Sequence, residues 1–280
     1  MFAADESSVK MSDADFKRIS TYIYESCGIK LPIAKRNMVE SRLKKRLKIT
    51  RQSSFKTYFD FVFTTAGKQE ELQYMVNAIT TNKTDFFREY NHFEFLRSTV
   101  LPELLDRSHN VLNVWSAGCS SGEEPYSLAM ALSEYMTDHV PFTFRILGTD
   151  LSTEVLSKAI RAVYTEDRIT DIPLHLRKKY LLRNKSHEQH DVRIIPDLRE
   201  KVTFQQLNFL EEDHRKLGNF HIIFCRNVLI YFDKPTQEMV LNKLISKLVK
   251  GGYLFIGHSE SLAHMNLPVQ QLRPSVFRKL

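Results

Sequence analysis

Apolar residues recur at helical spacing through the first eighty residues of the chain. Ser12 or Asp13 can cap a first helix, and Gly28 is a natural stop for it. A second helix with a narrow apolar stripe follows, then a third that is dense in aromatic residues, and a fourth over residues 71–79. The pattern predicts a small all-α N-terminal domain, to which we assign residues 1–75.

From about residue 110 the pattern changes to short apolar runs that end in small or polar residues. These runs are VLNVWSAG, FRILGTD, KVTFQQLN, FHIIFCRN and GGYLFIG. Helical patterns separate most of them, and this alternation indicates a parallel sheet covered on both faces. Residues 183–201 interrupt the alternation, so we expect a small inserted β-subdomain there. We assign residues 76–280 to this α/β domain.

The loop after the first predicted strand is a candidate ligand-binding loop, because open α/β sheets bind ligands at the carboxyl ends of their strands. Its small residues allow the backbone to approach a ligand closely. The loop lacks a GxGxxG pattern and the lysine of a phosphate-binding loop, so a polyphosphate is not indicated. Glu123 and Glu124 at the start of the next helix favour a cationic ligand or an ammonium group instead.

The other strand ends also carry polar residues. The second strand ends at Asp150, which suits a contact to ribose hydroxyls and equally suits the N-cap of the next helix. The third ends at Asn208 and the fourth at Arg226 and Asn227. Taken together, the series suits a ligand with a ribose, a base edge and an amino-acid part, such as S-adenosylmethionine.

A further constellation, NKTDFFR, precedes the sheet and ends at Arg88. Arg88 is either a surface arginine at a helix end or a fork that grips a carboxylate bidentately.

Composition adds one unexpected feature, a concentrated positive charge. The 280 residues carry a formal net charge of +7 and are 42% hydrophobic, which is typical of a globular protein rather than a disordered one. Residues 35–51 hold eight basic residues and one acid, so this segment alone accounts for the net charge. Such a segment is a nucleic-acid footprint, a solvated helix face, or a docking surface for an acidic protein.

Other composition features set expectations about location. No apolar run is long enough for a membrane helix, and the polar, acidic N-terminus does not fit a signal peptide. The three cysteines lack metal-ligand spacing, so we expect buried thiols, no metal site and a reducing cytoplasm.

The motifs resemble those of the CheR-type chemotaxis receptor methyltransferases, the protein-glutamate O-methyltransferases. The resemblance rests on NAITTNKTDFFRE, VWSAGCSSGEEPYSLAM, TD followed by LSTEVLSKA, LN, FCRNVLIYFDK and GGYLFIGHSE, and it covers nearly the whole chain. It implies a Rossmann-like S-adenosylmethionine-dependent methyltransferase fold behind an all-α domain. The implied reaction methylates glutamates on the cytoplasmic helices of chemoreceptors and leaves S-adenosylhomocysteine.

The resemblance also implies residue roles, carried over motif by motif. The implied cofactor contacts are Asn82, Thr84, Arg88, Glu124, Asp150, Asn208, Phe209, Arg226 and Asn227. The implied active-site pair is Arg88 and Tyr231, and Arg42 and Arg46 are the implied substrate-docking residues. In some members the β-subdomain docks a receptor pentapeptide. The glycines expected in its loop are missing here, so we do not expect that tether.

The sequence offers no obvious general base, and methylation of a glutamate does not require one. A glutamate side chain has an unperturbed pKa of about 4.3, so the nucleophile is already ionised at neutral pH. We expect a monomer that acts in the cytoplasm on membrane-bound receptor arrays, without a metal and without nucleic acid. Two other classes stay open at this point: a nucleic-acid methyltransferase that uses the basic helix, and a non-catalytic adaptor with a methyltransferase fold.

Overall fold

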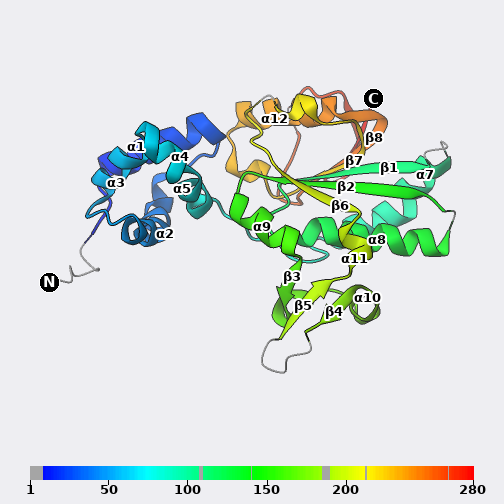
Figure 1. Ribbon diagram of the computed structural model, residues 1–280. Coiled ribbons are helices and arrows are strands. Elements are labelled where there is room, and N and C mark those ends of the chain that lie inside the picture. The colour runs from blue at the N-terminus through cyan, green and yellow to red at the C-terminus, as the bar shows by residue number, and fades with distance from the viewer. Residues whose placement is uncertain (1–8, 107–109, 140, 185–189, 212, 264) are drawn as a thin grey trace. The chain divides into compact units, whose positions relative to one another are not determined.

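The computed structural model describes residues 9–106, 110–139, 141–184, 190–211, 213–263 and 265–280. The chain forms two compact units, which we describe separately (Figure 1). The first extends to Thr81 and includes Tyr231–Asp233, and the second comprises Asn82–Ile230 and Lys234–Leu280. The boundary expected after residue 75 falls inside a continuous helix, Leu72–Ile79, so the limit between the units lies later, at 81/82.

The first unit is all-α. Its helices are α1 (Asp13–Cys27), α2 (Arg36–Ile49), α3 (Phe55–Val62), α4 (Thr65–Glu70) and α5 (Leu72–Ile79). A capping box between Ser12 and Asp15 starts α1, and Gly28 ends it in the left-handed conformation. The four helices expected from the pattern are present as α1, α2, α3 and α5, and the six-residue α4 is additional.

The core of this unit comes from one apolar face on each of these four helices. The buried side chains are Phe16, Ile19, Ile23, Val39, Leu43, Leu47, Phe55, Tyr58, Phe59, Val62, Met75 and Ile79. Burying one such side chain is worth about 1.5–3 kcal/mol, so the cluster is what orders these short helices. Most basic residues of α2 lie outside this apolar face, and Lys45 and Lys48 are exposed.

The second unit is built on a seven-stranded sheet in the order β6-β2-β1-β7-β8-β10-β9. The strands are β1 (Val111–Ala117), β2 (Thr143–Asp150), β6 (Val202–Gln206), β7 (Phe220–Cys225), β8 (Leu248–Ile256), β9 (Val269–Arg273) and β10 (Val276–Lys279). The pairs among β6, β2, β1, β7 and β8 are parallel, as the sequence predicts. β10 pairs antiparallel with β8 and β9, and the sequence analysis did not predict these last two strands.

Helices cover both faces of the sheet (Figure 1). The α-helices of this unit are α6 (Asn91–Phe95), α7 (Leu101–Asp106), α8 (Glu123–Asp138), α9 (Thr153–Arg161), α10 (Leu174–Tyr180), α11 (Pro196–Arg199) and α12 (Lys234–Ser246). α8 and α9 lie on one face and α12 lies on the other. β7 is buried along its whole length, as expected for a central parallel strand between two helical layers.

A second, three-stranded sheet contains β3 (Val163–Thr165), β4 (Leu181–Arg183) and β5 (Asp191–Ile194) in the order β3-β5-β4, with antiparallel pairing. Its first strand begins twenty residues before the expected insertion at 183–201, and residues 196–199 form α11 instead. A three-residue strand such as β3 is too short to show a period of two. The loop in which the family's glycines were sought includes residues 185–189, which lie outside the described residues.

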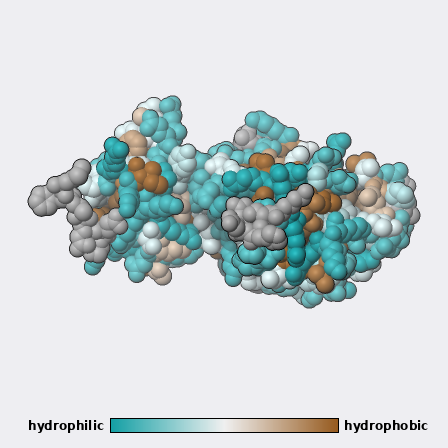
Figure 2. Space-filling model, turned by 60° about the horizontal axis from the view of Figure 1, so that its bottom comes forward, coloured by the Kyte–Doolittle hydropathy of each residue, from teal (hydrophilic) through white to brown (hydrophobic). Residues whose placement is uncertain are grey.

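The surface is largely polar on the face that Figure 2 shows, in contrast to the two apolar cores, and its apolar residues are gathered in small patches. Among the residues that the structure describes, no helix is long and apolar enough to cross a membrane. All three cysteines are buried and free, as the sequence analysis predicted.

Candidate functional site

The loop between β1 and α8 carries two glycines in the left-handed region. Gly118 has φ +86°, and a Cβ there would lie 2.4 Å from Cγ2 of Val228. Gly122 has φ +96°, and its Cβ would lie 2.9 Å from the Cβ of Ala159 in α9. Both positions therefore need glycine for conformation and for space. The result is a tight turn that brings the start of α8 to the carboxyl end of the sheet.

Asp150 ends β2 beside this turn. Its Oδ2 accepts a hydrogen bond from the backbone N–H of Ser120 at 2.8 Å, and its Oδ1 accepts one from Ser152 N–H at 2.9 Å. Burial raises the pKa of Asp150, while these backbone N–H groups oppose the rise. The N-cap of α9 is Ser152, so Asp150 is not the cap that the alternative interpretation required.

Glu124 and Arg226 form a buried ion pair across the ends of β1 and β7. Arg226 Nε donates to Glu124 Oε2 at 2.7 Å, and Ser116 donates to Glu124 Oε1 at 2.7 Å. The Arg226 side chain is only 2% exposed. Its Nη1 donates to the backbone oxygen of Arg88 at 2.6 Å, which ties the NKTDFFR segment to the strand ends. The structure thus brings together three residues that are separate in the sequence.

Glu123, the residue before Glu124, pairs with a different arginine. Its Oε1 lies 2.7 Å from Nη2 of Arg168, and its Oε2 accepts a hydrogen bond from Ser121. The side chain is 2% exposed, so its charge is balanced inside the protein. Both glutamates therefore have an arginine partner. Glu124 remains the candidate for an ammonium group because its partner, Arg226, lies at the end of β7, whereas Arg168 ties Glu123 to the segment of Thr84 and Asp85.

The other residues named from the sequence mostly contact the protein through loop and main-chain hydrogen bonds. The backbone oxygen of Asn82 accepts from Ser120 Oγ at 2.9 Å, and Thr84 is buried. Asn208 caps its own loop by accepting from Leu210 N–H. The remaining positions follow the same pattern of loop contacts: the backbone oxygen of Phe209 accepts from Lys243 Nζ, and the backbone N–H of Asn227 donates to Glu260.

Arg88 and Tyr231 fall in different units. Arg88 is half-buried, and its Nη1 donates to the backbone oxygen of Lys83 at 3.2 Å. Tyr231 belongs to the short segment that groups with the helical unit. There its backbone oxygen accepts from Lys30 N–H, and the ammonium of Lys35 lies 5.3 Å from its ring centroid. Their pairing as active-site residues stays a prediction.

Arg42 and Arg46 have internal partners that the sequence analysis did not foresee. Arg42 Nη1 donates to the backbone oxygens of Ile79 and Thr80, at the end of α5. Arg46 forms a two-pronged ion pair with Glu71, at 2.8 Å from Nε and 2.5 Å from Nη2. Because the Glu71 side chain is 4% exposed, this pair belongs to the core of the helical unit. Arg46 therefore cannot serve as a free docking charge.

Sequence reasoning missed Glu260, which organises the turn after β7. Its carboxylate accepts hydrogen bonds from the backbone N–H groups of Asn227, Leu229 and Gly257. Burial raises the pKa of Glu260, and these N–H groups oppose the rise. Asn227 has φ 58°, a conformation that asparagine tolerates better than most residues. The only sequence signal was the position of this glutamate in the GHSE motif.

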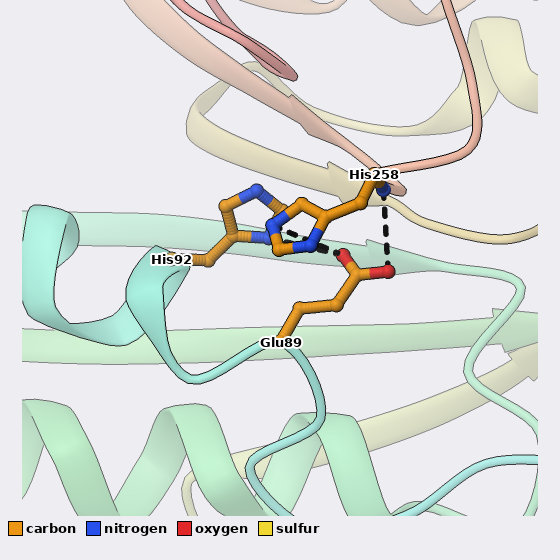
Figure 3. A group of neighbouring side chains, drawn as sticks. All are labelled: Glu89, His92 and His258. Atoms are coloured by element: carbon orange, nitrogen blue, oxygen red, sulfur yellow. Dashed lines mark hydrogen bonds and ion pairs between the residues drawn. The ribbon is translucent and has the colours of Figure 1, made fainter.

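Glu89, His92 and His258 form a second cluster beside the ion pair (Figure 3). Their ligand atoms lie within 4.8 Å of one another, which is close enough for a shared metal ion. However, Arg226 Nη1 lies 3.1 Å from His92 Nδ1 and 3.5 Å from Glu89 Oε2. A divalent cation about 4 Å from that guanidinium would be repelled by roughly 8 kcal/mol at an effective dielectric of about 20. The Arg226 guanidinium thus places a positive charge beside the carboxylate of Glu89.

The residues present fit S-adenosylmethionine. Asp150 accepts backbone N–H groups from Ser120 and Ser152, and Leu151 N–H adds a third, which leaves acceptor capacity for a ribose hydroxyl. Glu124 and Arg226 place opposite charges 2.7 Å apart, which matches the ammonium and carboxylate of an amino-acid end. Among the described residues, Arg226 Nη2 donates no hydrogen bond, so its two N–H groups remain for a ligand.

Comparisons with known proteins identify the family of the chain. Residues 82–277 match the family model of the CheR methyltransferase SAM-binding domain, and residues 14–80 match that of the CheR methyltransferase all-alpha domain. The chemotaxis protein methyltransferase of Borreliella burgdorferi is 38% identical over 276 residues, covering 97% of this chain and 96% of that protein. Chemotaxis protein methyltransferase 2 of Pseudomonas aeruginosa is 39% identical over 263 residues, covering 94% and 92%.

Among solved structures, magnesium protoporphyrin IX methyltransferase from Synechocystis with bound SAM aligns with a TM-score of 0.34 and 14% identity. That alignment covers 78% of this chain and 91% of the other. The sequence matches, which span nearly the whole chain, establish an S-adenosylmethionine-dependent methyltransferase of chemotaxis.

Proposed function

We propose that this chain, which belongs to the CheR methyltransferase family, methylates glutamate side chains on the cytoplasmic helices of chemoreceptors. The observation that carries the proposal is the position of Arg88. Its backbone is tied to Arg226 at the cofactor site, and among the described residues no carboxylate forms an ion pair with its guanidinium. A fork of this kind suits the carboxylate of an acceptor glutamate.

The chain has to position an acceptor that is already reactive. S-adenosylmethionine, when bound, supplies a methyl group activated by its sulfonium. The acceptor glutamate is ionised at neutral pH, so no side chain of the enzyme has to remove a proton. Arg88 orients the acceptor, and Tyr231 donates a hydrogen bond to it. Asp150 holds the ribose, and the pair of Glu124 and Arg226 holds the amino-acid end.

We place this reaction in the cytoplasm at membrane-bound receptor arrays, carried out by a monomer without a metal. The remaining cofactor contacts proposed are Asn82, Thr84, Asn208, Phe209 and Asn227. Phe209 contributes main-chain groups and packing, because its carbonyl is the part fixed by Lys243.

The test is transfer of labelled methyl from S-adenosylmethionine to a receptor cytoplasmic fragment, followed by mild alkali. Glutamyl esters release methanol under these conditions, whereas methylated nucleobases do not. Label that is retained after alkali, or that is transferred to nucleic acid instead, would contradict the proposal. Failure of the protein to bind S-adenosylhomocysteine would favour a non-catalytic adaptor.

Replacement of Arg88 by Ala is expected to lower kcat/KM for receptor methylation by about 100-fold, because loss of the fork leaves the carboxylate poorly oriented. Tyr231→Phe is expected to lower it by roughly tenfold, the value of one hydrogen bond. Initial rates with a receptor fragment measure both. Arg97→Ala and Tyr74→Phe are the matched controls, since both side chains are more than half exposed. An unchanged kcat/KM in Arg88→Ala would rule out the orienting role.

The basic segment 35–51 is proposed as a docking surface for the acidic receptor helices. The ion pair with Glu71 removes Arg46 from this surface. Arg42 keeps its charge because it donates only to neutral oxygens, and we add exposed cations such as Lys45 and Arg51 to it. Complementary charges mainly raise the association rate, and salt screens them.

Joint reversal of Lys45 and Arg51 to Glu is expected to raise KM for the receptor fragment by roughly tenfold at low salt, with little change in S-adenosylhomocysteine affinity. Lys17→Glu with Lys68→Glu is the control, since both lysines are exposed in the same unit and the net charge change is equal. Equal effects of the two pairs would show that only net charge matters. If neither double variant nor added salt changes the methylation rate, the basic segment 35–51 is only a solvated helix face.

A further inference from the structure

The ring of His92 contacts the guanidinium of Arg226, and the residue takes no part in the mechanism described above. It comes from α6, far from β7 in sequence, and its side chain is only 3% exposed. Figure 3 shows its ring next to the ring of His258 and close to the carboxylate of Glu89. A buried, polar ring in contact with a buried guanidinium requires an account of every hydrogen bond, because unmatched polar groups are costly there.

The hydrogens of Arg226 determine what His92 must do. A guanidinium carries five N–H groups and no acceptor. Nε–H donates to Glu124 at 2.7 Å, and one hydrogen of Nη1 donates to the Arg88 carbonyl at 2.6 Å. The second hydrogen of Nη1 points at His92 Nδ1, at 3.1 Å. Since arginine can only donate, Nδ1 has to be the unprotonated, accepting nitrogen of the ring.

The other side of the ring completes this assignment. Ser275 Oγ lies 2.7 Å from His92 Nε2, and the same hydroxyl donates to the backbone oxygen of Pro274 at 2.5 Å. The hydroxyl hydrogen is therefore used, so Ser275 accepts from Nε2–H. The donors run in one direction, from Arg226 through His92 and Ser275 to a main-chain carbonyl. This chain holds the ring in one tautomer and one orientation.

The surroundings keep the ring neutral. Burial first, and the positive charge of Arg226 second, lower the pKa of His92 to about 4. Glu89 opposes this shift with its carboxylate, and the neighbouring His258 adds to it. A protonated ring would turn a donor toward the donors of Arg226, so the arrangement depends on the neutral form.

We propose that His92 is a positioning residue for the cofactor: its Nδ1 anchors one arm of Arg226, so that the two N–H groups of Nη2 stay aligned for the carboxylate of S-adenosylmethionine. This rests on the proposed role of Arg226 in binding the cofactor. Three of the five N–H groups hold the guanidinium, and two remain for the ligand. Loss of the His92 acceptor lets the guanidinium of Arg226 rotate and leaves one of its buried N–H groups without a partner.

Two substitutions separate this role from simple filling of space. In His92→Asn the side-chain oxygen can occupy the place of Nδ1 and keep the acceptor. In His92→Gln the amide nitrogen can occupy the place of Nε2, so the contact to Ser275 is kept while the acceptor for Arg226 is lost. We expect S-adenosylhomocysteine, measured by calorimetry, to bind the Asn variant within about threefold of wild type and the Gln variant roughly 10- to 100-fold more weakly. A packing role predicts the opposite order, because Gln fills the space better.

His221→Gln is the matched control. His221 is also buried, and its Nδ1 accepts from the backbone N–H of Asn113 within the sheet. The loss of that contact should lower the melting temperature without weakening cofactor binding. A similar loss of affinity in this control, or wild-type affinity in His92→Gln, would overturn the proposal.

The wild-type protein gives an independent readout through the ¹⁵N NMR signals of the imidazole. We expect the His92 ring to be protonated at Nε2 and unprotonated at Nδ1. A ring protonated at Nδ1 would overturn the proposal even if neither variant folds. A wild-type enzyme that binds S-adenosylhomocysteine but methylates no receptor fragment would refute the proposed acceptor and leave the role of His92 standing.

Discussion

Replacement of Asp150 by Asn is expected to weaken S-adenosylhomocysteine binding by about 100-fold. The carboxylate accepts from Ser120 N–H and Ser152 N–H, and keeps acceptor capacity for the ribose. Asn has one oxygen and turns an NH₂ donor toward a backbone N–H or a hydroxyl. Two charge-assisted hydrogen bonds, each worth about 1.5–3 kcal/mol, are weakened or lost.

Calorimetric titration with S-adenosylhomocysteine measures this effect directly. Asp171→Asn is the control, because that acid is exposed and lies in the same unit. The control should bind like wild type. Wild-type affinity in Asp150→Asn would exclude the ribose contact and would limit Asp150 to ordering the loop around Ser120.

The second large effect concerns stability. Arg46→Met is expected to destabilise the helical unit by about 3–5 kcal/mol, because it leaves the Glu71 carboxylate buried without its cation. Burial raises the pKa of Tyr58, which keeps its hydroxyl neutral and donating to Glu71 at 2.8 Å. One neutral donor cannot replace the two-pronged contact of Arg46. Thermal and urea unfolding, followed by circular dichroism, measure the loss.

A double variant, Arg46→Met with Glu71→Leu, tests the cause. Removing both charges is expected to restore most of the stability, leaving a deficit of about 1 kcal/mol for the hydroxyl of Tyr58. Arg18→Met is the control, since the pair of Arg18 with Asp60 is exposed and should be worth less than about 1 kcal/mol. If Arg46→Met unfolds like this control, Arg46 is free to act as a docking residue after all.

Arg46 shows what the sequence could not reveal. Its place on a basic helix predicted an exposed cation, and the helix itself was predicted correctly from Val39, Leu43 and Leu47. The partner, Glu71, lies on another helix 25 residues away. Periodicity identifies which face of a helix is buried, but it does not show which charge from another helix meets its edge.

In the α/β unit, too, local patterns were predictable from the sequence and contacts between distant residues were not. Strand ends were predictable because apolar runs stop at polar residues, and the structure ties Asp150 to the loop that precedes Glu124. The strands β3, β9 and β10 were not predicted, because runs of three to five residues show little alternation. The role of His92 depends on contacts to Arg226 and Ser275, 134 and 183 residues away in sequence.

The most direct test of the central claim is to map the methylated residue on a receptor cytoplasmic fragment. The fragment is incubated with enzyme and S-adenosylmethionine, digested, and analysed by mass spectrometry before and after mild alkali. The account predicts that one methyl is added on glutamate side chains, is removed by alkali, and is absent when Asp150→Asn replaces the wild type at limiting cofactor. An alkali-stable methyl on lysine, or on any residue other than an acidic one, would contradict it.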